Sequence, residues 1–158
     1  MTEVIDITLT ISGDTHRLSV PPRRILADLL RDELQLTGCK IGCDQAVCGA
    51  CTVLVGNLPV TACATFAFEL DGKEVTTIEG LARDGALHPV QRAFLEHGAL
   101  QCGFCTPAMI LSVKALLARH PDPDEPLIRQ WLSANICRCT GYQMIIEAVR
   151  AAAKAGGS

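Results

Sequence analysis

Nine cysteines occur in 158 residues, and eight of them fall into two groups. The first group is the segment CDQAVCGAC, at positions 43–51, together with Cys63. The second group combines CGFC at 102–105 with CRC at 137–139. An odd number of cysteines cannot complete a set of disulfides, because one sulfur is left over. The grouping therefore favours metal binding or redox chemistry over a disulfide framework.

The first group has the spacing C-x4-C-x2-C followed by a distant cysteine, which is the plant-type ligand pattern of a 2Fe-2S cluster. A sharply bent loop can supply three of the four thiolates, and a separate strand end supplies the fourth. Gly42 and Gly49 suit such a bend, because glycine tolerates positive φ and lets amide N–H groups approach the sulfurs. The predicted ligands are Cys43, Cys48, Cys51 and Cys63.

A zinc site and buried free thiols are the alternatives for this first group. Structural zinc sites usually combine two C-x2-C units, and the first group has only one. We therefore favour the iron-sulfur interpretation. Cys39 precedes Cys43 and lies outside the pattern, so we expect it to be a half-buried spectator thiol.

The second group is a C-x2-C pair and a C-x-C pair, and each pair precedes a helix-start signal. Thr106-Pro107 predicts an N-cap with proline at the first helical position, and Thr140 and Gln143 fit the capping box T-x-x-Q. Helix N-termini favour an anionic centre, so two of them would bring the sulfurs together around a second 2Fe-2S cluster. Taken alone, this group is also compatible with zinc. The predicted ligands are Cys102, Cys105, Cys137 and Cys139.

The remaining sequence predicts an α+β protein. Alternating β-branched residues predict a β-hairpin over 4–11 and 16–21. Helical spacing predicts a helix over 25–36 that stops at Gly38. Further elements are expected as strands over 52–62 and 73–79, and as helices over 88–98, 107–119, 125–134 and 141–154.

The change from strands to helices places a domain boundary near residue 80. Residues 1–80 would form a small mixed sheet with one helix, and residues 81–158 would form a bundle of four short helices. Each domain contains one cysteine group, so each is expected to hold one cluster.

Composition argues against several other functions. The net charge is −3 with no run of Lys or Arg, so nucleic-acid binding has little support. The N-terminus is unlike a signal peptide and no stretch is apolar enough to span a membrane, so a cytoplasmic location is expected. Neither a GxGxxG nor a P-loop pattern occurs. We expect no catalytic residues in this chain, and one-electron transfer in place of bond making.

Three segments of the chain carry a family resemblance: GCDQAVCGACTV, QCGFCTPAMI and NICRCTGYQMI. In them the chain resembles the small iron-sulfur subunit of the xanthine oxidase family, the molybdenum hydroxylases. The small subunits of carbon monoxide dehydrogenase, 4-hydroxybenzoyl-CoA reductase and the nicotinate or N-heterocycle dehydrogenases are similar. The resemblance covers nearly the whole chain. Ala108 departs from the family, which usually has glycine there, and a small packing change is the expected consequence.

The resemblance implies an N-terminal β-grasp 2Fe-2S ferredoxin-like domain followed by a C-terminal four-helix-bundle 2Fe-2S domain. It implies a heterotrimer with a large molybdopterin subunit and a medium FAD subunit, and it allows a dimer of heterotrimers. Gln101 and Cys139 match residues beside the pterin. Electrons would pass from molybdenum to the second cysteine group, then to the first, then to FAD. The partner subunits of this molybdenum-dependent oxidoreductase would carry out substrate turnover.

Two other functions are compatible with the cysteines. A free-standing two-cluster ferredoxin would shuttle between partners, but such carriers tend to be strongly acidic and a net charge of −3 is mild. A zinc-binding interaction module is the more distant alternative. It would lack the red-brown colour and the iron, about four atoms per chain, that two 2Fe-2S clusters give.

Overall fold

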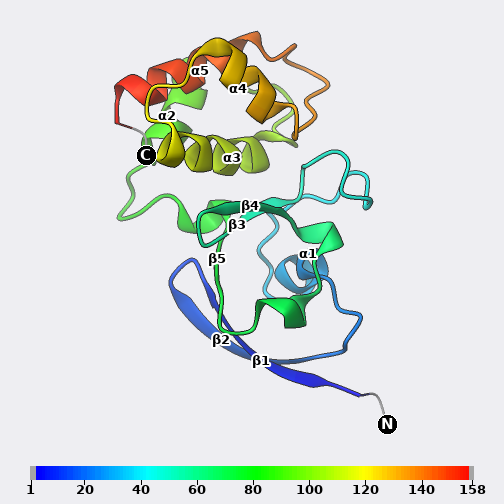
Figure 1. Ribbon diagram of the computed structural model, residues 1–158. Helices are drawn as coiled ribbons and strands as arrows, with labels where there is room; N and C mark the ends of the chain where they lie inside the picture. The colour runs from blue at the N-terminus through cyan, green and yellow to red at the C-terminus, as the bar shows by residue number, and fades with distance from the viewer. Residues whose placement is uncertain (1–2, 157–158) are drawn as a thin grey trace.

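Figure 1 shows the computed structural model of the chain, in which residues 3–156 are described. A mixed β-sheet with short helical turns forms the N-terminal half, and four longer α-helices form the C-terminal half. The two halves are in contact, with the sheet below the helices in this view. Among the described residues, no helix has the length and apolar character needed to cross a membrane.

The strands are β1 (Ile5–Ile11), β2 (Asp14–Val20), β3 (Thr52–Val55), β4 (Leu58–Thr61) and β5 (Glu74–Thr76). They form one sheet with the order β2-β1-β5-β3-β4, in which only the β1–β5 pairing is parallel. The predicted first hairpin is confirmed. Ser12 and Gly13 in its turn both have positive φ, as a type I′ turn requires.

The predicted helix over 25–36 is shorter than expected and changes type. It consists of α1 (Leu26–Asp28) and a π-helical turn, η1 (Leu29–Glu33). Leu34 N–H donates to the Leu29 carbonyl at 3.1 Å, which is the π-helical spacing. Gln35 then takes a left-handed φ of 57° and ends the helix, so the predicted stop at Gly38 is wrong.

Three 3-10 turns were not predicted: η2 (Ala62–Ala64), η3 (Ala67–Leu70) and η4 (Ile78–Gly80). The strand expected over 73–79 is reduced to β5, because the chain enters η4 directly after it. Cys63 lies on η2, two residues after β4 ends at Thr61, and not on the strand end at which it was expected.

The four predicted helices are present, close to their expected bounds: α2 (Pro89–Glu96), α3 (Thr106–Arg119), α4 (Glu125–Leu132) and α5 (Gln143–Lys154). Helix α3 contacts both the sheet and the other helices, and nine of its residues are buried. A helix that is apolar nearly all round is expected in such a central position.

Each half has its own hydrophobic core, and strand β3 contributes to both. Leu9 and Val53 belong to the sheet core, whereas Phe94 and Leu116 belong to the helix core. Leu54 is 1% exposed and packs into the helix core although it lies on β3. Successive strand residues point to opposite faces, so adjacent side chains of β3 enter different cores.

Helix α2 begins at a histidine cap. His88 Nδ1 accepts a hydrogen bond from Val90 N–H at 3.2 Å, and Gln91 Oε1 accepts one from His88 N–H at 3.0 Å. Only a neutral His88 accepts at Nδ1. Burial, followed by the charge of Lys114, lowers the pKa of His88 below its usual value.

This cap is expected to make stability depend on pH. In the unfolded chain a histidine takes up a proton at about pH 6.5, whereas the pKa of His88 in the folded protein is lower. The stabilisation by the His88 cap is therefore complete above about pH 6.5 and decreases as the pH falls below that value. His88→Asn keeps a good N-cap that does not titrate. Urea unfolding at about pH 7.5 and pH 5.5 should show a larger loss of stability for the wild type than for His88→Asn. Equal losses would contradict this role.

Candidate metal centres

The first cysteine group lies on a loop that turns sharply between η1 and β3. Asp44, Ala46 and Gly49 take left-handed φ values of 56°, 56° and 67°. Left-handed residues that alternate with ordinary ones turn successive amide N–H groups toward one concave face. Four of these amides donate to sulfur: those of Gln45, Val47 and Cys48 to Cys43 Sγ at 3.4, 3.3 and 3.3 Å, and that of Ala46 to Cys63 Sγ at 3.4 Å.

These hydrogen bonds favour negative charge on the sulfurs. The N–H of Cys48, with those of Gln45 and Val47, lowers the pKa of the Cys43 thiol to about 7. A lower pKa favours the thiolate, which is the form that binds metal. Hydrogen bonds to sulfur also stabilise an anionic cluster and tune its potential.

The two glycines predicted to shape this loop act in different ways. Gly49 has the expected positive φ. Gly42 does not have a positive φ. It instead allows the backbone to lie close to the Cys48 side chain, because a Cβ at Gly42 would lie 3.0 Å from Cys48 Sγ. The left-handed residues Asp44 and Ala46 were not predicted. Asp adopts this conformation more often than most residues, but no feature of the sequence marks the alanine.

The eight grouped sulfurs come together as pairs, and none of the nine cysteines forms a disulfide. The pairs in contact are Cys43 with Cys48, Cys51 with Cys63, Cys105 with Cys137, and Cys102 with Cys139, whose two Sγ atoms are 3.5 Å apart. Each cysteine group therefore presents two thiol pairs.

This paired arrangement suits two irons better than one zinc ion. A zinc site needs four donors around one atom. A 2Fe-2S cluster takes two thiolates on each iron, which is the number that the two pairs in each group supply. The donor set therefore fits a 2Fe-2S cluster in both groups.

The second group precedes two helices as predicted, although the cap of the first helix is displaced by one residue. Cys105 is the N-cap of α3, so Thr106 is the first helical residue and Pro107 the second. Proline is tolerated there because the amides of the first turn have no intrahelical acceptor. The pair Cys102 and Cys105 thus ends at the N-terminus of α3.

The predicted capping box at the start of α5 is wrong. Tyr142, with a left-handed φ of 70°, is the N-cap, and Gln143 Nε2 donates to Glu147 Oε1 at 3.1 Å. Thr140 Oγ1 accepts from Tyr142 N–H at 3.2 Å and lies 3.1 Å from Cys137 Sγ. The side chain of Tyr142 points toward the preceding cysteine loop, where its hydroxyl accepts a hydrogen bond from Cys137 N–H at 2.8 Å. A contact with the cysteine loop has replaced local capping.

Gln101 and Cys139 are adjacent, since Gln101 Nε2 donates to the Cys139 carbonyl at 3.1 Å. Both residues are exposed, and so is Cys102. One edge of the second group is therefore open to a partner. The expected closeness of Gln101 and Cys139 to a pterin stays a prediction.

Cys39 differs from the grouped cysteines. It is more deeply buried than expected, and its thiol donates to the Cys51 carbonyl at 3.5 Å. Burial, followed by the neighbouring Cys51, raises the pKa of the Cys39 thiol to about 12. Because this thiol bonds to a backbone carbonyl and lies outside the two cysteine groups, the spectator role stays the prediction for Cys39.

The two cysteine groups meet where the sheet contacts the helices. Ile136 N–H, immediately before Cys137, donates to the Cys48 carbonyl at 2.9 Å. A Cβ on Gly42 would lie 3.5 Å from Phe104, which belongs to the CGFC segment. Two segments far apart in the sequence are thus joined at their cysteine loops.

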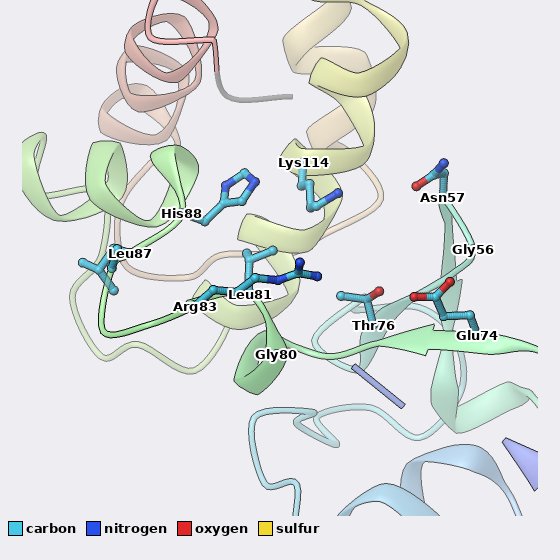
Figure 2. Close-up of a pocket in the computed structure, with 11 residues that line it drawn as sticks. Gly56, Asn57, Glu74, Thr76, Gly80, Leu81, Arg83, Leu87, His88 and Lys114 are labelled. Carbon is cyan, nitrogen blue, oxygen red and sulfur yellow. The ribbon is translucent and has the colours of Figure 1, made fainter. Parts of the chain in front are cut away.

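A groove of about 560 Å³ lies elsewhere between the two halves (Figure 2). Arg83, His88 and Lys114 line its helical side, and Glu74 and Asn57 line its sheet side. Its lining contains no cysteine. The groove therefore takes no part in the two thiol sites.

Comparison with known proteins supports two iron-sulfur sites. Residues 9–82 match the family model of a 2Fe-2S iron-sulfur cluster binding domain, and residues 77–150 match that of a [2Fe-2S] binding domain. The chain is 47% identical to the 6-hydroxypseudooxynicotine dehydrogenase complex subunit beta of Paenarthrobacter nicotinovorans, over 90% of this chain and 89% of that one. It is also 47% identical to the nicotinate dehydrogenase small FeS subunit of Eubacterium barkeri, over 92% and 93%. The chain belongs to the xanthine oxidase family, as a small iron-sulfur subunit. It is thus a subunit of an oxidoreductase.

Solved structures support the fold of this iron-sulfur subunit. Quinoline 2-oxidoreductase from Pseudomonas putida 86 superposes with a TM-score of 0.93 at 43% identity, over 97% of this chain and 96% of that one. Aldehyde oxidoreductase from Desulfovibrio gigas gives a TM-score of 0.90 at 43% identity. The match covers 94% of this chain but 17% of that longer protein. The predicted combination of a mixed sheet with helices is confirmed, and the boundary at residue 80 stays a prediction.

Proposed function

We propose that this iron-sulfur subunit carries electrons within a heterotrimeric molybdenum hydroxylase. Electrons would pass from a molybdenum-pterin centre in a large subunit, through two 2Fe-2S clusters, to FAD in a medium subunit. Residues 1–80 would be a β-grasp ferredoxin-like domain and residues 81–158 a four-helix bundle, with one cluster each. The observation that carries the proposal is the set of four thiol pairs, two in each half, with the halves joined at their cysteine loops.

The proposed ligands of the first cluster are Cys43, Cys48, Cys51 and Cys63, and those of the second are Cys102, Cys105, Cys137 and Cys139. A bound 2Fe-2S cluster supplies one-electron redox chemistry. The residues of the chain supply the rest: the amides of the 43–51 loop donate to sulfur, and the N-terminus of α3 lies at Cys105. Both features favour the negative charge of a thiolate-ligated centre.

The exposed edge at Gln101, Cys102 and Cys139 is the proposed contact with the molybdenum-pterin subunit. The 43–51 loop, also partly exposed, would then face the FAD subunit. Direct approach of a cofactor requires these surfaces to be covered in the complex. Three exposed apolar side chains around the cysteine groups support this arrangement: Val47, Phe104 and Ile136.

The proposal is tested by isolating the chain from native cells with its partners attached. We expect two co-purifying polypeptides, one carrying molybdenum and one carrying FAD, and about four irons on this chain. A chain that carries iron but no partner polypeptide would instead be a shuttling ferredoxin. Zinc in place of iron would exclude both functions.

The apolar residues beside the cysteines give a further prediction. Phe104 is 46% exposed, and Phe104→Ser should weaken association with the partners about 5- to 30-fold, because roughly 1–2 kcal/mol of apolar burial is lost. Leu58 is 54% exposed at the end of the β3–β4 hairpin away from Cys51, so Leu58→Ser is the matched control. Analytical ultracentrifugation of the reconstituted complex measures the difference. Equal weakening by both changes would show that the surface around Phe104 has no special part in assembly.

A further inference from the structure

One buried side chain, Asn135, crosses from the helical half to the loop of the first cysteine group. It is 2% exposed and lies between α4 and Cys137. Its Nδ2 donates to the Gly49 carbonyl at 2.8 Å and to Thr52 Oγ1 at 3.2 Å. Its Oδ1 accepts from Ser112 Oγ of α3 at 2.7 Å. The amide is thus hydrogen-bonded on both of its ends inside the protein.

The surface that receives Asn135 fits it closely. Thr52 Oγ1 also donates to the Gly49 carbonyl, at 2.7 Å, so the three residues form a closed set of hydrogen bonds. A Cβ on Gly49 would lie 2.2 Å from the Ala134 carbonyl oxygen and 2.6 Å from Asn135 Nδ2. There is room only for glycine, which lets the two backbones approach.

These contacts flank the direct link between the cysteine groups. Gly49 follows Cys48, and Asn135 precedes Ile136, whose N–H donates to the Cys48 carbonyl at 2.9 Å. Cys137 comes next in the chain. A path of a few covalent bonds and one hydrogen bond therefore connects a proposed ligand of one cluster to a proposed ligand of the other.

We propose that Asn135 is a positioning residue for electron transfer between the two clusters. It holds the Cys48 carbonyl against the Ile136 N–H and so fixes the separation and orientation of the two cysteine groups. A buried amide suits this role, because its two donors tie the helical half to Gly49 and Thr52. Without them, the Gly49 carbonyl would keep only its bonds from Thr52, which belong to its own half of the chain. The inference rests on the proposed two-cluster relay, but it concerns only the geometry between the sites.

The experiment compares the wild-type complex with Asn135→Asp and Ser112→Ala. Aspartate has nearly the same shape and keeps an acceptor for Ser112, but it lacks both donors and places a carboxylate against the Gly49 carbonyl. Ser112→Ala removes a buried hydrogen bond of the same network and leaves both donors in place. It therefore controls for a general loss of stability.

Two measurements report on the geometry: hydrogen exchange of the Ile136 amide, and the magnetic interaction between the two reduced clusters in EPR spectra. In Asn135→Asp we expect exchange at Ile136 to become about tenfold faster and the interaction to be reduced or lost, while about four irons remain. In Ser112→Ala we expect both to stay near wild type. Unchanged exchange and unchanged interaction in Asn135→Asp would overturn the inference.

Two further results separate this inference from the proposed function. A wild-type complex without iron, or with one cluster, would overturn the relay itself. If Asn135→Asp gives no folded complex, Thr52→Val provides the second test. Valine has a similar shape, and the change removes one of the two acceptors of Asn135 together with the Thr52 hydrogen bond to the Gly49 carbonyl. Faster exchange at Ile136 in Thr52→Val would support the role of Asn135, and an unchanged rate would overturn it.

Discussion

Replacing Cys137 by serine is expected to remove about half of the iron, from about four atoms per chain to about two, and to abolish electron transfer through the subunit. Cys137 is buried, contacts Cys105 and lies beside the hydroxyl of Thr140. A serine there remains a neutral hydroxyl and cannot replace the thiolate that binds metal. Iron analysis and EPR of the reduced protein measure the loss, and the signal of the first cluster should persist.

Cys39→Ser is the matched control for this change. Cys39 is also buried, and a serine hydroxyl can still donate to the Cys51 carbonyl. The variant should therefore keep about four irons and both EPR signals. Retention of all iron by Cys137→Ser, or loss of iron from Cys39→Ser, would contradict the proposed ligand sets.

The second large effect is expected for Gly49→Ala, which should lower the free energy of unfolding by roughly 2–5 kcal/mol. A left-handed φ of 67° costs alanine about 1–2 kcal/mol. The clash of its Cβ with the Ala134 carbonyl, at 2.2 Å, involves backbone on both sides and should add about 1–3 kcal/mol. Urea unfolding, followed by both cluster absorbance and circular dichroism, measures the change.

Gly56→Ala separates the two causes. Gly56 also has a left-handed φ, of 59°, but its Cβ would find no atom within 4 Å. This variant should lose only the conformational part, about 1–2 kcal/mol. If both alanine variants were destabilised equally, the close approach of Gly49 to Ala134 would contribute nothing.

The elements that depend on local pattern could be predicted from the sequence. Alternating residues gave the first hairpin, and helical spacing gave the four C-terminal helices within a few residues of their bounds. The cysteine spacing identified both thiol groups because short loops limit where their sulfurs can lie. The hairpin and the helices need only neighbours within one turn or one hairpin. The joining of CGFC to CRC spans more than thirty residues, and its prediction rested on the helix-start signal after each pair.

The features that depend on distant contacts could not be predicted. Tyr142 replaces the expected capping box because its hydroxyl bonds to the amide of Cys137, in the preceding loop. Asn135 has no local pattern, since its partners Gly49 and Thr52 lie more than eighty residues away. The π-helical turn before Gln35 also deviates from the regular spacing on which the prediction rested.

Strand β3 has a consequence for dividing the chain. Leu54 contributes to the helix core while Val53, beside it, contributes to the sheet core. Cleavage near residue 80 would expose Leu54 to solvent in the N-terminal fragment. It would also leave a cavity in the helix core of the C-terminal fragment, where Leu54 had packed. The two family models meet near residue 80, but the packing of the protein does not divide there. The two halves are therefore expected to unfold as one cooperative unit.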